Sequence, residues 1–150
     1  MSPETLADEG TPRPRWDVFT RDGELGVRGE GRTPEEAFEQ VALALCTRVT
    51  DPSTVEVREE VEVVCEAVDR SELLVEWLRS VVQWMASRQL RFRCFAVRLD
   101  GPRLFGHGFG EPLDPSRHRP SRDVRGFSLT GPTVRWSADG RWSAECEVEL

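Results

Sequence analysis

The chain has 150 residues, a hydrophobic fraction of 38% and a formal net charge of −7. That length suits one domain with one core, and the acidic balance excludes a protein that grips nucleic-acid phosphates by charge alone; it favours a basic partner or a bound cation. No apolar run approaches the roughly 18 residues of a membrane span, and the polar, proline-rich start does not resemble a signal peptide, so we expect a cytoplasmic protein with no membrane contact.

The first predicted segment is a leader. Residues 1–14 are rich in proline and charge, and we expect them to be disordered, with one folded domain over residues 15–150. Short strands are predicted around residues 16–19 and 25–29, and the polar stretch between them predicts a break.

Two helices are predicted from their starting residues. Thr33 can accept a hydrogen bond from the amide of Glu36, the intervening proline suits the first helical position, and an apolar stripe covers residues 37–45. Asp69 offers a second cap, and the dense apolar stripe over residues 73–85 predicts a central helix that packs in the core.

Alternating apolar and polar residues predict the remaining strands. They cover residues 55–65, 90–99, 104 onward, 124–129, 133–136 and 142–150, with a hairpin turn at 138–141. Because the late strands follow one another without a helix, the predicted fold class is α+β: two layers, with a mixed or antiparallel sheet of about six or seven strands and two helices packed on one face.

Several chemically active residue types carry a structural interpretation. The cysteines form no close pair and each lies in an apolar pattern, so we expect buried free thiols rather than zinc ligands or disulfides; they are Cys46, Cys65, Cys94 and Cys146. Residues 106–110 are glycine-rich but lack a following helix and a P-loop lysine, which favours a bulged strand over a phosphate cradle. His107 and His118 are expected at the surface, because no Cys or His spacing makes them zinc ligands.

Four segments carry motifs of one known protein family. Residues 31–38 resemble the segment in which a glycine and a threonine open a helix beginning EEAF, and residues 73–78 resemble the second-helix signature. Residues 110–118, with Glu-Pro after a glycine and Arg-His at the end, resemble the GEP loop. Val124-Arg125-Gly126 stands where the family has a valine, a lysine and a small residue. Together these segments resemble the archease family, and the resemblance covers residues 16–150.

This resemblance implies an accessory protein rather than an enzyme. Archeases activate the GTP-dependent RNA ligase that joins tRNA halves and repairs RNA ends, and they promote its guanylation and turnover. The implied partner is therefore the ligase protein, with RNA contacted only indirectly. Because they lie in family motifs, Arg125 and Glu111 are candidate partner-binding residues.

The resemblance also implies a divalent metal held by acidic residues near the two ends of the chain. The matching positions are Glu24, Glu149 and Leu150, the last through its carbonyl or a terminal carboxylate, and Asp22 is a spare candidate. Such oxygen ligands suit calcium or magnesium.

The sequence departs from the family pattern where the metal would bind. The family motif His-Thr-Ala-Asp-Val-Gly is replaced by residues 21–26, so Glu24 stands for an aspartate, and Ala86 stands for an aspartate at the end of the second helix. An alternative function is therefore an archease-fold interaction module that has lost metal binding and the activator role. If these residues have only structural roles, Glu149 lies on the solvent-exposed face of a strand and Asp22 is a turn residue. An independent enzyme has the least support, because no base and nucleophile pair is visible.

Overall fold

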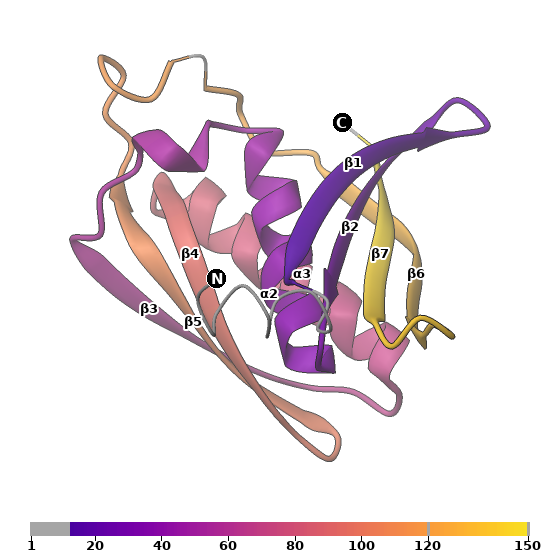
Figure 1. Ribbon diagram of the computed structural model, residues 1–150. Helices are drawn as coiled ribbons and strands as arrows, with labels where there is room; N and C mark the ends of the chain where they lie inside the picture. The colour runs from indigo at the N-terminus through magenta and orange to yellow at the C-terminus, as the bar shows by residue number, and fades with distance from the viewer. Residues whose placement is uncertain (1–12, 120, 150) are drawn as a thin grey trace, which may run out of the picture.

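The computed structural model describes residues 13–119 and 121–149, which form two α-helices and seven strands in two antiparallel sheets (Figure 1). The four-stranded sheet has the order β1-β2-β7-β6, with bounds β1 Arg15–Arg21, β2 Glu24–Gly31, β7 Trp142–Glu149 and β6 Ser128–Trp136. The three-stranded sheet has the order β3-β5-β4, with bounds β3 Glu59–Glu66, β5 Arg103–Pro112 and β4 Leu90–Asp100. The helices are α2, Pro34–Thr47, and α3, Arg70–Ser87, and a 3₁₀ turn, η1, covers Pro52–Thr54.

The α+β class and the strand number are confirmed, and the strands divide into two sheets. Both helices lie between the sheets rather than on one outer face: α2 contacts β2 and β4, and α3 contacts β6 and β3 (Figure 1). The division follows from the loop after Pro112, which carries the chain from the three-stranded sheet to β6 in the other sheet. The predicted leader, residues 1–14, lies outside the described residues except for Arg13 and Pro14.

Both predicted helix starts are confirmed at the level of single hydrogen bonds. The Thr33 hydroxyl accepts from the amide of Glu36 at 3.1 Å, and the Asp69 carboxylate accepts from the amide of Glu72 at 2.8 Å. The Glu36 carboxylate accepts from the amide of Arg32 at 2.7 Å, one residue before the cap itself. Each helix therefore begins where its own side chains satisfy amides that have no partner within the helix.

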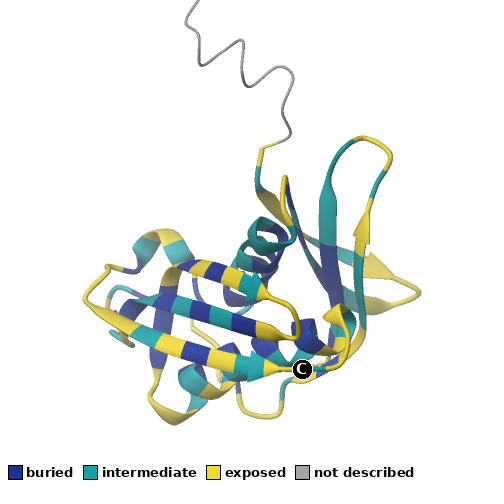
Figure 2. Cartoon of the chain, turned by 90° about the horizontal axis from the view of Figure 1, so that it is seen from below, coloured by how far each residue is buried: buried dark blue, intermediate teal, exposed yellow. Residues whose placement is uncertain are grey.

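The core lies on the inner faces of the two sheets, around Trp77. Its side chain is fully buried, its indole Nε1–H donates to the carbonyl of Phe38 at 3.0 Å, and its ring meets Phe95 edge to face at 5.6 Å. A Cβ on Gly106 would lie 2.4 Å from the Trp77 ring, so the glycine run of β5 serves close packing. The glycines at residues 106–110 predicted a bulge in their own strand; the structure has the bulge on the neighbouring strand β4, after Phe92. Figure 2 shows the resulting bands of buried and exposed residues along the strands.

The β1–β2 connection is a two-residue turn at Asp22 and Gly23. Both residues have positive φ, 52° and 82°, as a type I′ hairpin turn requires, and Asp-Gly is a favoured pair for it. The predicted strand over residues 55–65 begins later, at Glu59. The amide of Glu56 donates to the side chain of Glu111 rather than to the backbone of a neighbouring strand. Across the described ranges, neither helix combines the length and the apolar character needed to cross a bilayer.

All four cysteines are free thiols, as expected, but they differ in burial. Cys46 and Cys146 are buried and Cys65 is intermediate, whereas Cys94 is exposed, which corrects the prediction of burial for that residue. The sequence pattern of β4 did not show the bulge after Phe92. Cys94 follows this bulge and lies on the outer face of the sheet.

We expect Cys94 to react first with a thiol reagent such as DTNB in the folded protein. Burial raises the pKa of Cys46 to about 12, and Cys46 has almost no exposed surface, so it should react only as the protein unfolds. Burial also raises the pKa of Cys94, so its reaction should be slow at pH 7 and speed up above pH 9. Peptide mapping of the labelled protein checks the order; early labelling of Cys46 would contradict the burial described here.

Candidate functional site

Glu24 and Glu149 lie at the same end of two neighbouring strands. Strands β2 and β7 pair antiparallel, with Gly26 opposite Glu147, and each strand continues for two further residues to Glu24 and Glu149. Continuing that register places the two acids opposite each other, and residues opposite each other in an antiparallel pair point to the same face. Both are exposed. The chain thus brings together two carboxylates that are far apart in sequence.

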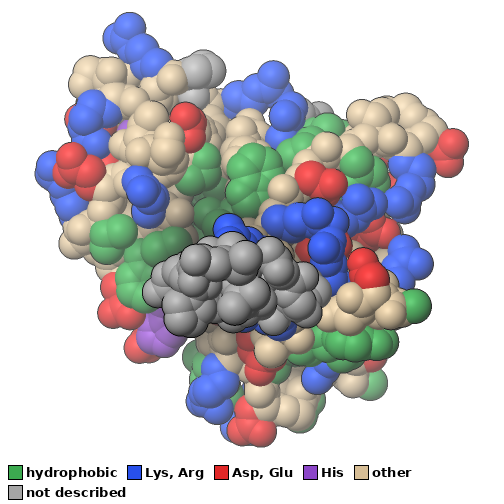
Figure 3. Space-filling view, viewed as in Figure 1, with side chains coloured by type: hydrophobic (Ala, Val, Ile, Leu, Met, Phe, Trp, Pro, Cys, Tyr) green, Lys and Arg blue, Asp and Glu red, His purple; other side chains and the backbone are tan. Residues whose placement is uncertain are grey.

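The face that carries these acids points away from the helices. On the opposite face of β2, a Cβ on Gly29 would lie 2.1 Å from the amide nitrogen of Val41 in α2, so that face is pressed against the helix. The alternation of the strand then places Gly26, Arg28 and the two acids on the outer face. In Figure 3, basic and acidic side chains intermingle over the visible surface rather than forming a field of one sign.

Arginines already occupy another carboxylate on this face, Glu145. Glu145 is 4% exposed and accepts from Arg28 at 3.0 Å and from Arg135 at 3.0 Å, and Arg21 lies 3.6 Å away. Burial alone would raise the pKa of Glu145, but the hydrogen bonds and charges of these arginines hold it below its ordinary value. Arg21, which stands where the family has a histidine, therefore takes part in a local ion-pair cluster.

The remaining predicted ligands do not complete a side-chain cluster. Leu150 lies outside the described residues. Asp22 has φ 52° and lies in the β1–β2 turn, as the alternative to a ligand role expected. Within residues 13–119 and 121–149, no three His, Cys, Asp or Glu side chains come close enough to share an ion. Glu24 and Glu149 have the oxygen chemistry that calcium and magnesium prefer, so a cation here would complete its shell with main-chain oxygen or water.

Glu111, the second candidate partner residue, is an internal carboxylate. It is 2% exposed and accepts from the Arg117 guanidinium at 2.6 and 2.9 Å and from the amide of Glu56 at 2.7 Å. The bonds from Arg117, supported by Glu56 and His118 and opposed by burial, lower the pKa of Glu111 to about 2. Glu111 thus ties the loop after β5 to the segment between η1 and β3, and it offers no surface to a partner.

His118 is buried, so the prediction that it lies at the surface was wrong. Its Nδ1 accepts from the amide of Asp114 at 2.8 Å, which leaves the ring proton on Nε2, 3.0 Å from a Glu111 oxygen. The spacing of the histidines and cysteines gave no sign that His118 would be buried against Glu111. The signal was the combination of a glutamate after an apolar strand with Arg117-His118 six and seven residues later, because a buried acid needs such partners.

Arg125, the other candidate partner residue, is exposed. Its side chain is 79% accessible and forms a fork with Asp123, with its closest contact at 2.6 Å. Hydrogen bonds from Arg125 lower the pKa of Asp123 to about 2. The loop that carries both residues runs into β6, where Ser128 lies opposite Glu149, so it approaches the same end of the four-stranded sheet.

Residues 16–149 match the Archease protein family (MTH1598/TM1083). The chain belongs to the archease family. The protein archease of Pyrococcus abyssi is 33% identical over 140 residues, which cover 91% of this chain and 99% of the relative. The protein archease of Thermococcus gammatolerans is 36% identical over the same length, with the same coverage.

The fold agrees with a solved archease-family structure. The solution structure of Methanobacterium thermoautotrophicum protein 1598 superposes with a TM-score of 0.67 at 25% identity, over 90% of this chain and 98% of that one. The archease assignment therefore rests on sequence over nearly the whole domain and on the arrangement of its strands and helices. Against that background, Ala86 near the end of α3 is half-buried and supplies no carboxylate.

Proposed function

We propose that this archease is a non-catalytic activator of a GTP-dependent RNA ligase and that it promotes ligase guanylation and turnover through a divalent cation. The observation that carries the proposal is the β2–β7 register, which brings Glu24 and Glu149 to one end of the sheet. Glu24 and Glu149 would hold the ion, together with the main chain or terminus at Leu150. A cation there would supply positive charge to phosphate oxygens at the ligase's nucleotide site.

The neighbouring loop supports the same proposal. Arg125 is exposed and lies in a loop that leads to this end of the sheet, so it is placed to meet an acidic surface or a phosphate beside the cation. The buried bonds of Glu111 to Arg117 and His118 hold the start of that loop. Arg125 would therefore contact the partner directly, and Glu111 would act by positioning.

The test measures both cation binding and ligase activity. Glu24→Gln/Glu149→Gln should lose calcium or magnesium binding by calorimetry and should stop accelerating guanylation and multiple turnover of the ligase from the same organism. Glu62→Gln/Glu66→Gln is the matched control, since both residues are exposed on β3 in the other sheet. Asp22→Asn, which keeps the turn, should behave as wild type unless Asp22 is a ligand.

A metal-free interaction module is the second candidate function. It is favoured by the fact that the described ranges contain no cluster of three potential ligand side chains. It predicts that the Glu24/Glu149 double variant matches wild type in ligase binding and that no cation produces measurable heat. Unchanged ligase turnover over a wide range of protein and cation concentrations would refute the activator proposal.

A further inference from the structure

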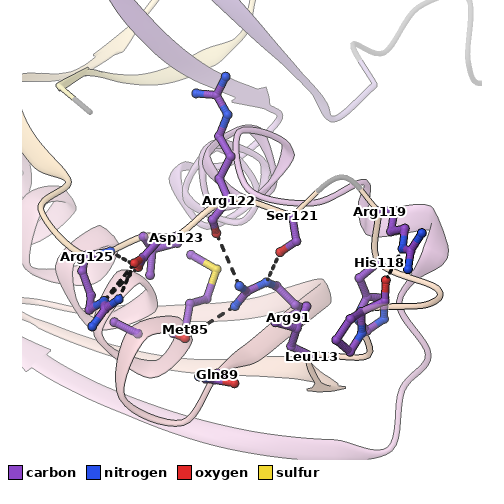
Figure 4. Close-up of a pocket in the computed structure, with 13 residues that line it drawn as sticks. Met85, Gln89, Arg91, Leu113, His118, Arg119, Ser121, Arg122, Asp123 and Arg125 are labelled. Atoms are coloured by element: carbon purple, nitrogen blue, oxygen red, sulfur yellow. Dashed lines mark hydrogen bonds and ion pairs between the residues drawn. The ribbon is translucent and has the colours of Figure 1, made fainter.

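A basic pocket opens between the end of α3, the start of β4 and the loop after β5. Its volume is about 490 Å³, and Figure 4 shows its lining side chains. The lining combines apolar side chains, among them Met85, Leu113 and Val124, with polar ones. Arg91 lies in the middle of the polar group, between Ser121 and Met85 (Figure 4). This size is typical of sites for small organic ligands, about 300–1,000 Å³.

Arg91 is a buried cation that has no counter-ion among the residues the structure describes. The residue is 5% exposed. Its described hydrogen bonds all go to neutral groups: the carbonyls of Leu90, Met85 and Arg122 and the hydroxyl of Ser121. These bonds engage four of its five N–H groups, and one on Nη2 has no acceptor among the described residues. Burial lowers the pKa of Arg91, which reflects the cost of holding that charge away from water.

The nearby acids are already committed elsewhere. Glu111 lies opposite Arg91 in the strand register, but Arg117 and His118 occupy its carboxylate. Asp123, the one acid in the pocket lining, is held by Arg125 at 2.6 Å. The buried carboxylates Glu111 and Glu145 each form an ion pair with an arginine. Arg91, by contrast, has no oppositely charged group within ion-pair distance in the described ranges.

Further cations surround the pocket. Arg119 and Arg125 belong to its lining, and Arg122 lines it too, although its side chain points away from Arg91 in Figure 4. With Asp123 as the one acid, the lining carries a clear excess of positive charge inside a protein of net charge −7. Gln89 completes the rim in a left-handed conformation, φ 52°, at the end of α3.

We propose that this pocket binds a small phosphorylated ligand, with the Arg91 guanidinium as the buried anchor for its phosphate. A phosphate group carries the charge and the acceptor oxygens that a guanidinium with a free N–H can use. The apolar lining residues Met85, Leu113 and Val124 would contact the organic part of the ligand. The site uses none of the residues assigned to the cation, but it shares Arg125 with the proposed ligase contact. Arg91 has no part in that contact, so variants at Arg91 test the pocket separately from the ligase role.

Titration of the full chain tests the proposal, by NMR or calorimetry at constant ionic strength. The probes are inorganic phosphate, ribose 5-phosphate and a nucleoside monophosphate, with acetate as the reference anion. We expect shifts confined to the pocket, and Arg91→Gln should weaken phosphate binding about tenfold or more, the effect of one charge-assisted hydrogen bond. Arg98→Gln, at an exposed arginine on the same strand, should bind like wild type.

A second variant decides the matter if Arg91→Gln fails to fold. Gln89→Asp keeps Arg91 and adds a carboxylate to the rim, where aspartate tolerates the left-handed backbone better than glutamine. It should abolish phosphate binding and raise the melting temperature, because Arg91 gains a counter-ion.

The probes also distinguish the sources of the phosphate. Tighter binding of the two phosphate esters than of inorganic phosphate identifies an organic phosphate, and equal binding identifies the free anion; either result supports the site. Equal binding of acetate and phosphate, no shift with any probe, or binding of an RNA oligonucleotide without binding of the small probes would overturn it.

Discussion

Replacing Glu111 with alanine is expected to destabilise the protein by about 3 kcal/mol, the range for removing one member of a buried ion pair. The change leaves the Arg117 guanidinium, the His118 ring and the amide of Glu56 without their acceptor. We place the effect at the lower end of that range because the Arg117 side chain is 34% exposed and can turn toward water. Thermal unfolding followed by circular dichroism should show a melting temperature lower by about 10 °C.

The same carboxylate predicts a pH dependence of stability. Because the folded state lowers the pKa of Glu111 from 4.5 to about 2, its contribution is complete above pH 4.5 and is lost as the pH falls toward 2. Glu111→Gln cannot titrate, so the difference in unfolding free energy between wild type and variant should shrink across that window. Glu62→Gln, at an exposed glutamate of β3, is the control with the same charge change. A constant difference from pH 6 to pH 2.5 would contradict the description of Glu111.

Gly29→Ala is expected to cost about 3 kcal/mol or more, since it overpacks a tight interface. A Cβ at Gly29 would lie 2.1 Å from the amide nitrogen of Val41 and 2.3 Å from the carbonyl oxygen of Ala37. Both are backbone atoms of α2, so the clash is relieved only if the helix moves off the sheet. The melting temperature should fall by about 10 °C or more, measured by calorimetry or circular dichroism.

Gly26→Ala on the same strand is the matched control. Its new Cβ would lie 2.2 Å from the ring of Phe19, a side chain on the outer face of the sheet that can rotate away. The control should therefore lose much less stability than Gly29→Ala. Equal losses for the two variants would mean that α2 does not lie as close to β2 as described here.

Local signals in the sequence predicted the local structure well. The caps at Thr33 and Asp69 were predictable because a side chain and the amide it serves are three residues apart. The alternation over residues 142–150 likewise predicted β7. The division into two sheets was not predictable this way, because period-two patterns report a strand without naming its partner.

The candidate site shows the same limit. The family resemblance suggested that Glu24 and Glu149 share a site. Their closeness in space, however, depends on the register between β2 and β7, two strands from opposite ends of the sequence. The buried state of His118 and the missing counter-ion of Arg91 depend on which groups surround them after folding. The structure shows that the loop after β5 closes over an acid, Glu111, on one side and a cation, Arg91, on the other.

The pairing of β2 with β7 has a consequence for how the chain is made. About 120 residues separate the paired positions, so a nascent chain presents β2, already joined to β1, with one row of backbone groups unmatched until β7 leaves the ribosome. The three-stranded sheet has all its segments by residue 112 and does not wait in this way. If synthesis stops before residue 142, the released chain would therefore expose β2 as an unpaired edge strand that can aggregate.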